Sequence, residues 1–277
     1  MQPLSRWPAA ERRQIVGVFT DIDDTLTTEG AITPEALQAL AELKAAGLPV
    51  IAITGRPLGW SEPFAASWPL DAIVAENGAV ALFRQNGAVA IKRAAGPASV
   101  GREALSKLYQ QDAATRAANF ARMQRVAQRV LREVPGSRLA EDSPGRETDI
   151  AIDHSERTEL PPERIAQVVQ LMRSEGMNAT VSSIHINGWY GEHDKLAGAR
   201  WILSELLGRA LDAEIERWVY VGDSPNDQRM FEHFPHSVGV TNIRRFEAEL
   251  RHRPRYITAA ERGAGFAELA QALMVVR

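Results

Sequence analysis

The stretch IVGVFTDIDDT, residues 15–25, sets a run of apolar side chains directly before three carboxylates. The apolar part, 15–20, is continuous rather than alternating, which is typical of a parallel strand buried on both faces. A helix is predicted next, because Thr33 can cap it and Pro34 suits its first position. A second buried strand follows at 49–54. Strand, helix and strand in this order indicate a right-handed crossover in a parallel sheet.

The alternation of buried strands and helices is interrupted after about residue 85 and resumes near residue 188. A third apolar run, 217–222, again ends at a carboxylate, whereas the stretch 86–187 has the mixed helix and strand signals of a separate α+β unit. The sequence therefore predicts an α/β fold. Its core is a doubly wound parallel sheet formed by 1–85 and 188–277, and 86–187 is an inserted α+β domain.

Three further predictions concern the secondary structure of single segments. The apolar spacing of three and four residues predicts a helix over 98–134. Residues 89–93 read as a short strand. The polar residues 1–13, which include two prolines, are predicted to fray.

Composition excludes several classes of protein. The chain has 277 residues, 45% of them hydrophobic and 24% charged, which is ordinary for a globular protein with a real core. It has no cysteine, so disulfides, zinc–thiolate sites, iron–sulfur clusters and cysteine nucleophiles are excluded. The net charge of −3 argues against nucleic-acid binding driven by charge. We expect no membrane span and no signal peptide, and a cytoplasmic location; the oligomeric state stays open.

The carboxylates after the first strand are candidates for chemistry. In open α/β sheets ligands gather beyond the carboxyl ends of the strands, where Asp21 and Asp23 are placed. Three carboxylates within four residues repel one another unless a cation neutralises them. Oxygen ligands without His or Cys favour Mg²⁺. The alternative is an acidic loop that caps a helix.

Two more segments follow strands in the same way, and a lysine lies between them. TGRP, 54–57, offers a hydroxyl, a glycine and a guanidinium to a phosphate oxygen, or is simply a turn before a helix. DSPND, 223–227, offers two carboxylates and an amide. Lys195 starts a helix after Asp194 and is either a ligand for phosphate or a solvated surface charge. Together these groups are the parts that phosphoryl transfer requires.

These segments resemble a known family. DIDDT, TGRP, the lysine of EHDK and GDSPND look like the four motifs of the haloacid dehalogenase (HAD) phosphatase superfamily, in the family's order. The place of the insertion and the ENGA sequence resemble the type IIB cap group, which includes Cof-like, sucrose-phosphate and mannosyl-3-phosphoglycerate phosphatases. Asp24 departs from the pattern, because many members have glycine there.

The resemblance implies a role for each motif residue. Asp21 would attack phosphorus and form an aspartyl phosphate, while Asp23 would act as general acid and then general base. Phosphate oxygens would be held by Thr54, Gly55, Lys195 and Asn226. The Mg²⁺ ion would be held by Asp21, Asp23 (through its backbone carbonyl) and Asp223, and Asp227 would support it directly or through water.

The substrate is expected to be a small phosphorylated metabolite, and the inserted domain is expected to select it. Strand alternation places His185 and Asn187 on one side, where they contact sugar hydroxyls or are merely exposed. Arg56 would reach the substrate or pair with a core carboxylate. The predicted activity is Mg²⁺-dependent hydrolysis of a sugar phosphate or phosphorylated glycoside. The alternatives are a phosphosugar mutase and a non-catalytic phosphosugar-binding regulator.

Overall fold

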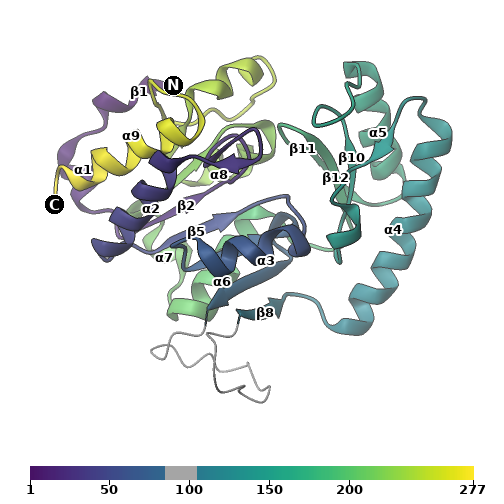
Figure 1. Cartoon of the computed structure of the whole chain (residues 1–277), viewed down its shortest axis with the longest axis horizontal. Coiled ribbons are helices and arrows are strands. Elements are labelled where there is room, and N and C mark those ends of the chain that lie inside the picture. Colours follow the sequence, from purple (N-terminus) through teal and green to yellow (C-terminus); the bar gives the residue numbers. More distant parts are fainter. Residues whose placement is uncertain (85–104) are drawn as a thin grey trace.

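The computed structural model describes residues 1–84 and 105–277. Figure 1 shows a larger body that carries both chain ends and a smaller body beside it. The predicted strand at 89–93, and the part of the predicted helix before residue 105, lie outside the described residues.

The larger body is built on one sheet, which has nine strands within the described residues. Its strands, in spatial order, are β1 (Gln2–Pro3), β15 (Tyr256–Ile257), β14 (His236–Gly239), β13 (Trp218–Gly222), β2 (Gly17–Thr20), β5 (Val50–Ile53), β6 (Ala72–Ala75), β7 (Val80–Arg84) and β8 (Leu105–Tyr109). All neighbours from β1 to β6 are parallel, and β7 and β8 add antiparallel. A separate hairpin pairs β3 (Thr27–Thr28) with β4 (Ala31–Ile32).

Helices cover both faces of this sheet (Figure 1). On β2, Val18 packs into one apolar cluster and Phe19 into another, so the strand is buried on both sides. The first cluster includes residues of α2 (Pro34–Ala45), α3 (Leu58–Ser67) and α9 (Arg262–Met274). The second includes residues of α6 (Lys195–Leu207), α7 (Leu211–Glu214) and α8 (Gln228–His233). The predicted doubly wound α/β core is confirmed.

The smaller body, residues 112–190, is called the cap below, and the other described residues are called the core. Its sheet has the order β11 (Asn178–Val181), β12 (His185–Trp189), β10 (Ile150–Asp153) and β9 (Arg138–Leu139). The helices α4 (Ala113–Glu133) and α5 (Pro162–Ser174) pack on it through a single apolar cluster that contains Met123, Val130 and Met172. The cap is thus an α+β unit with its own small core.

The helix predicted over 98–134 is wrong at its start. Residues 105–109 form β8 rather than helix, and α4 begins only after Asp112, whose side chain accepts the N–H of Thr115 at 2.9 Å. Pairing of β8 with β7 also extends the core sheet past the predicted boundary at residue 85. The helical spacing begins at Phe120, and a strand that depends on a distant partner carries no such local signal.

The N-terminal segment does not fray. β1 pairs in parallel with β15, and α1 (Ala9–Arg13) follows it. Trp7 is buried and stacks on Tyr256 with ring centroids 5.5 Å apart. These partners lie about 250 residues away along the chain, so the first residues look unstructured when the sequence is read locally. None of the helices among the described residues is both long and apolar enough to cross a membrane.

Candidate active site

The predicted motif residues meet at one edge of the sheet. Asp21 follows β2, Thr54 follows β5 and Asp223 follows β13, and these three strands are parallel neighbours. In the sheet, β5 lies on one side of β2 and β13 lies on its other side, so the strand order reverses at β2. Their carboxyl ends therefore meet at a topological switch point, which is where ligands bind in open α/β sheets.

Lys195 is buried at the start of α6 and points into this group. Asp194 caps the helix by accepting the N–H of Ala197 at 2.8 Å, as predicted. The Nζ of Lys195 lies 2.6 Å from Asp21 Oδ1 and 2.7 Å from Asp227 Oδ1. Burial alone would lower the pKa of Lys195, but the two carboxylates overcome this effect and raise it. Lys195 is therefore a fixed buried cation and not a solvated surface charge.

Asp227 organises the loop after β13. Its Oδ2 accepts the backbone N–H groups of Asp223 and Ser224 at 2.9 and 3.1 Å. Its Oδ1 accepts hydrogen bonds from Lys195 and from the hydroxyl of Tyr220. Each oxygen of Asp227 therefore already has two donors. Asp227 lies among the predicted metal ligands, but its contacts are those of a residue that positions Lys195 and Asp223.

We expect Asp227→Asn to lower the free energy of unfolding by about 3 kcal/mol, because it leaves the buried Lys195 with one carboxylate fewer and two N–H donors with a poorer acceptor. Urea denaturation measures this loss. The control is Asp212→Asn, which breaks an exposed ion pair with Arg200 and should cost less than about 1 kcal/mol. Equal effects of the two substitutions would show that Asp227 has no organising role.

The carboxylates form a site that fits a divalent cation. Oxygen atoms of Asp21, Asp223 and Asp227 lie within 4.8 Å of one another. Asp223 Oδ2 accepts a hydrogen bond from Asn242 at 3.1 Å, whereas the buried Oδ1 has no partner among the described residues. A buried carboxylate oxygen without a donor is costly, and Mg²⁺ prefers such hard oxygen ligands. The predicted ligands Asp21 and Asp223 therefore fit Mg²⁺.

Burial, more than any neighbour, sets the protonation of these carboxyl groups. Burial raises the pKa of Asp21 to about 8, with Lys195 opposing the shift and Asp227 adding to it. Burial likewise raises the pKa of Asp223 well above its ordinary value, and the charge of Asp21 adds to the effect. Without a cation the site therefore retains protons. A divalent cation would favour the ionised forms that the chemistry requires.

We expect the Mg²⁺-free protein to lose thermal stability as the pH rises from about 4 towards 8. The folded-state pKa values of Asp21 and Asp223 lie above the unfolded value of 3.8, so the folded protein binds more protons than the unfolded chain. The stability that these groups contribute is therefore complete at low pH and falls as they ionise. Saturating Mg²⁺ should flatten the slope. Tm measured at several pH values with and without Mg²⁺ tests this, and equal slopes would contradict it.

Asp24 occupies the position at which the sequence departs from the family pattern. Its φ of 54° lies in the left-handed region, which explains why glycine suits the position and why aspartate is tolerated. Arg245 and Arg262 each lie 3.1 Å from its carboxylate. Neither arginine, nor Asn242 beside Asp223, belongs to a motif, and all three come from the last 36 residues of the chain. Sequence reasoning missed them, and no local signal marks them.

Arg56 connects Asp23 of the core to the cap. Its guanidinium lies 2.8 Å from Asp23, 3.2 Å from Asp142 and 2.9 Å from Glu156. The hydrogen bond from His185 lowers the pKa of Glu156 to about 2. The positive charge of Arg56 adds to this effect, and burial opposes it. These contacts match the alternative interpretation of Arg56, a salt bridge to a core carboxylate, and two cap carboxylates extend it, whereas a contact of Arg56 with substrate stays a prediction. Each of the three guanidinium nitrogens of Arg56 has an acidic partner in this arrangement.

Core and cap residues together enclose a small cavity of about 10 Å³. Asp21, Gly55 and Asn226 line it from the core, and His185 and Asn187 line it from the cap. The two cap residues are 2% and 1% exposed, so they are not the exposed strand residues of the alternative interpretation.

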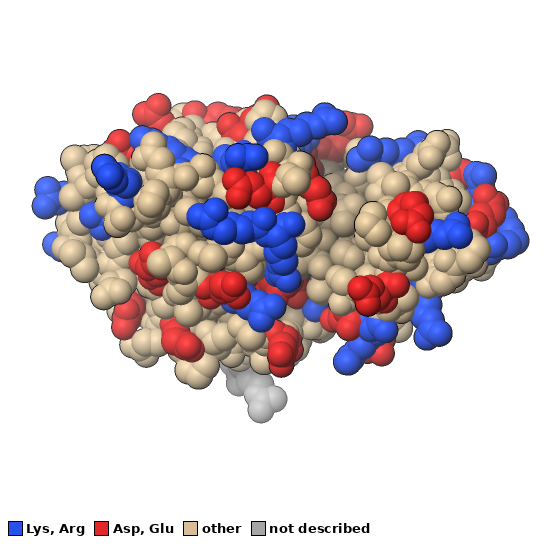
Figure 2. Space-filling model, turned by 90° about the horizontal axis from the view of Figure 1, so that it is seen from above, with Lys and Arg blue, Asp and Glu red and all other residues tan. Residues whose placement is uncertain are grey.

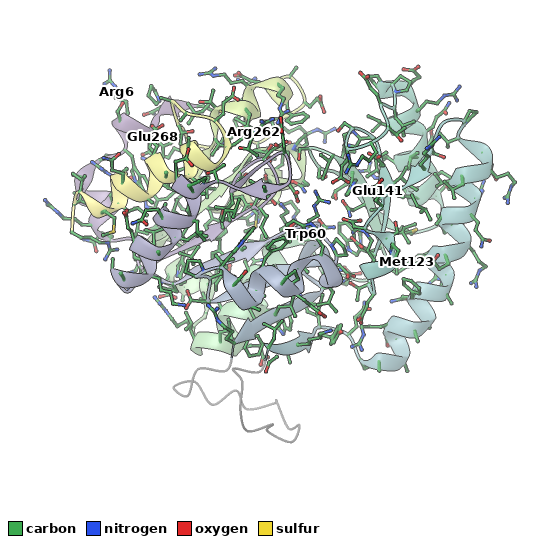
Figure 3. All side chains as sticks on the ribbon, viewed as in Figure 1. Arg6, Trp60, Met123, Glu141, Arg262 and Glu268 are labelled. Atoms are coloured by element: carbon green, nitrogen blue, oxygen red, sulfur yellow. The ribbon has the colours of Figure 1, made fainter. Side chains whose placement is uncertain are left out.

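Larger hollows of about 790 and 320 Å³ lie beside this cavity, and in Figure 2 the surface is hollowed along the boundary between core and cap. Figure 3 labels Trp60 and Glu141 on the core and cap sides of that boundary.

This geometry can be compared with known proteins. Residues 18–122 match the family described as haloacid dehalogenase-like hydrolases. This match supports the resemblance that the four motifs indicate. No curated protein matched the sequence.

Solved structures share this fold over almost the whole length of the chain. A sucrose-phosphatase from Synechocystis sp. PCC6803, in complex with sucrose and phosphate, has 15% identity and a TM-score of 0.62, with 95% of this chain and 98% of that chain covered. A HAD/COF-like hydrolase from Plasmodium vivax has 14% identity and a TM-score of 0.65, with 98% and 100% covered. A sugar phosphatase of HAD subclass IIB has 15% identity and a TM-score of 0.59, with 94% and 97% covered.

Proposed function

We propose that this HAD-like hydrolase is a Mg²⁺-dependent phosphomonoesterase that acts through an aspartyl phosphate. The observation that carries the proposal is the contact of Asp21 with the buried Lys195, next to Oδ1 of Asp223, which has no partner among the residues that the structure describes. A nucleophilic carboxylate, a fixed cation and a divalent-metal site within one pocket are what phosphoryl transfer needs, because most of the task is to position and neutralise charge.

The reaction begins with attack of an Asp21 carboxylate oxygen on phosphorus, which breaks the bond to the leaving oxygen. Asp23 gives its proton to that oxygen and then takes one from the water that hydrolyses the aspartyl phosphate. Arg56 holds Oδ1 of Asp23 and leaves Oδ2 for proton transfer. Asp21, Asp223 and the backbone carbonyl of Asp23 would hold Mg²⁺, which when bound neutralises phosphate charge.

The phosphate group would be held by the remaining motif residues. Lys195 supplies a positive charge, and Thr54, Gly55 and Asn226 supply a hydroxyl, a backbone N–H and an amide. Asn226 Oδ1 accepts from the hydroxyl of Ser224 at 2.8 Å, which leaves its amide N–H₂ group for a phosphate oxygen. The closed cap excludes water from the cavity during transfer, and its opening would release the products.

For the substrate we propose a small sugar phosphate or phosphorylated glycoside. Structures of a sucrose-phosphatase and of a subclass IIB sugar phosphatase share this fold and support the class by analogy. His185 and Asn187 line the cavity from the cap and would offer polar atoms to hydroxyls.

A panel of phosphorylated metabolites, assayed with Mg²⁺ for release of inorganic phosphate, tests the function. Phosphate release supports the phosphomonoesterase. Conversion of a sugar phosphate into its isomer without free phosphate would point to a mutase, which passes the phosphoryl group to a second hydroxyl. Binding without turnover of any ester would point to a non-catalytic regulator.

A further inference from the structure

Besides its two chain connections, the cap contacts the core through the segment between β9 and β10. The segment 142–149, between β9 and β10, includes the short helix η3 (Ser143–Gly145), which packs against α3. Here Gly145 of the cap and Gly59 of the core approach so closely that a Cβ on Gly59 would lie 3.0 Å from the Cα of Gly145. The backbones of the cap and the core are therefore in direct contact.

Two cap side chains at this contact donate to one carbonyl of the core. Arg146 Nη1 donates to the backbone oxygen of Gly55 at 2.9 Å, and Asn187 Nδ2 donates to the same oxygen at 3.2 Å. Asp149 holds both donors, because its two oxygens lie 2.7 Å from Arg146 and 3.0 Å from Asn187. All three side chains are at least 96% buried. A carbonyl only accepts, so it fixes the amide orientation of Asn187.

The Gly55 carbonyl, which accepts these two hydrogen bonds, belongs to the loop that carries the proposed phosphate-binding groups. The C=O of Gly55 and the N–H of Arg56 share one planar peptide unit, so holding one fixes the other. That N–H donates to Thr54 Oγ1 at 3.0 Å. The hydroxyl oxygen of Thr54 is thus already an acceptor. Among the described residues its proton has no acceptor, which leaves it for a ligand oxygen.

We propose that Arg146 and Asn187, held by Asp149, are positioning residues through which the closed cap fixes the phosphate-binding hydroxyl of Thr54. Neither residue reaches the phosphorus by this route, since both act through the Gly55–Arg56 peptide unit. The inference rests on the proposed function and adds a link between cap position and phosphate affinity. Closing of the cap raises the affinity of the site for phosphate, and opening lowers that affinity before the product leaves.

Arg146 and Asn187 could have a simpler role, which is to hold the cap against the core without positioning Thr54. A matched control variant distinguishes the two roles. Glu156 of the cap also pairs with the core, through Arg56 at 2.9 Å, but it does not contact the Gly55 carbonyl. If tethering alone matters, Glu156→Gln and the Arg146 variant should weaken phosphate binding alike. If positioning matters, only the Arg146 and Asn187 variants should do so.

The experiment compares Arg146→Lys, Asn187→Ser and their double variant in the full chain with Mg²⁺. Lysine keeps the positive charge, but a single ammonium cannot replace the planar guanidinium, whose Nη1 donates to Asp149 and to the Gly55 carbonyl while Nε and Nη2 donate to Asp142. The probe is inorganic phosphate as a competitive inhibitor. We expect its Ki to rise about tenfold in each single variant and about 100-fold in the double variant, and to stay unchanged in Glu156→Gln.

Hydrogen exchange of the Arg56 amide gives a second readout that needs no substrate. It should be faster in the double variant than in the wild type. An unchanged Ki and unchanged exchange in the double variant would overturn the inference, as would an equal rise of Ki in Glu156→Gln. If Arg146→Lys fails to fold, Asn187→Ser carries the test, because it removes no charge. Lack of wild-type phosphatase activity would instead overturn the proposed function and leave the exchange result interpretable.

Discussion

Asp21→Asn should reduce kcat by at least about 10⁴-fold, because an amide cannot attack phosphorus and form the covalent intermediate. The fold should survive the substitution. Burial raises the pKa of Asp21 to about 8, so the site already tolerates an uncharged group there, and Lys195 retains its contact with Asp227 at 2.7 Å.

The measurement is kcat with Mg²⁺ on the best substrate of the panel, together with Tm and circular dichroism of both proteins. A variant that folds normally and keeps a kcat within about tenfold of the wild type would remove Asp21 as the nucleophile.

Asp223→Asn should abolish the response to Mg²⁺ and lower kcat by about 10³-fold. Within 1–84 and 105–277, the buried Oδ1 of Asp223 has no hydrogen-bond donor, so a cation would compensate it, and an amide is a weaker ligand for Mg²⁺ than a carboxylate. In the wild type, Mg²⁺ at about 100 times its Kd should stabilise the fold by about 2.7 kcal/mol. The variant should lose this gain.

Asp24→Asn is the matched control for that substitution. Asp24 is also acidic and also lies at the site, but Arg245 and Arg262 pair with its carboxylate. It should therefore keep the Mg²⁺-dependent rise in Tm. The metal assignment would be wrong if Asp223→Asn kept the rise, or if both variants lost it equally.

The predictable parts of the fold have local signals. The apolar runs before Asp21 and Asp223 are the neighbouring strands β2 and β13, and alternate residues of β2 are buried on opposite faces. Thr33 and Asp194 accept backbone N–H groups at 3.3 and 2.8 Å, as their capping patterns predict. These features depend on residues within a few positions of one another, so one sequence suffices to place them.

The parts that could not be predicted depend on distant partners. β1 and β8 are short strands that are stabilised by pairing with β15 and β7. At the site, a salt bridge of Arg56 to a core carboxylate could be expected, but its cap partners lie 86 and 100 residues away. The contact of Arg146 and Asp149 with the Gly55 loop likewise exists only after the cap folds against the core.

The most direct test of Asp21 as a nucleophile in a metal-assisted site is a single turnover with excess enzyme, quenched in acid and analysed by peptide mass spectrometry. With Mg²⁺ present, we predict one phosphoryl group on the peptide that contains Asp21, and none after EDTA treatment or in Asp21→Asn. Turnover of the substrate with no phosphorylated peptide, or with the phosphoryl group on another residue, would contradict the mechanism.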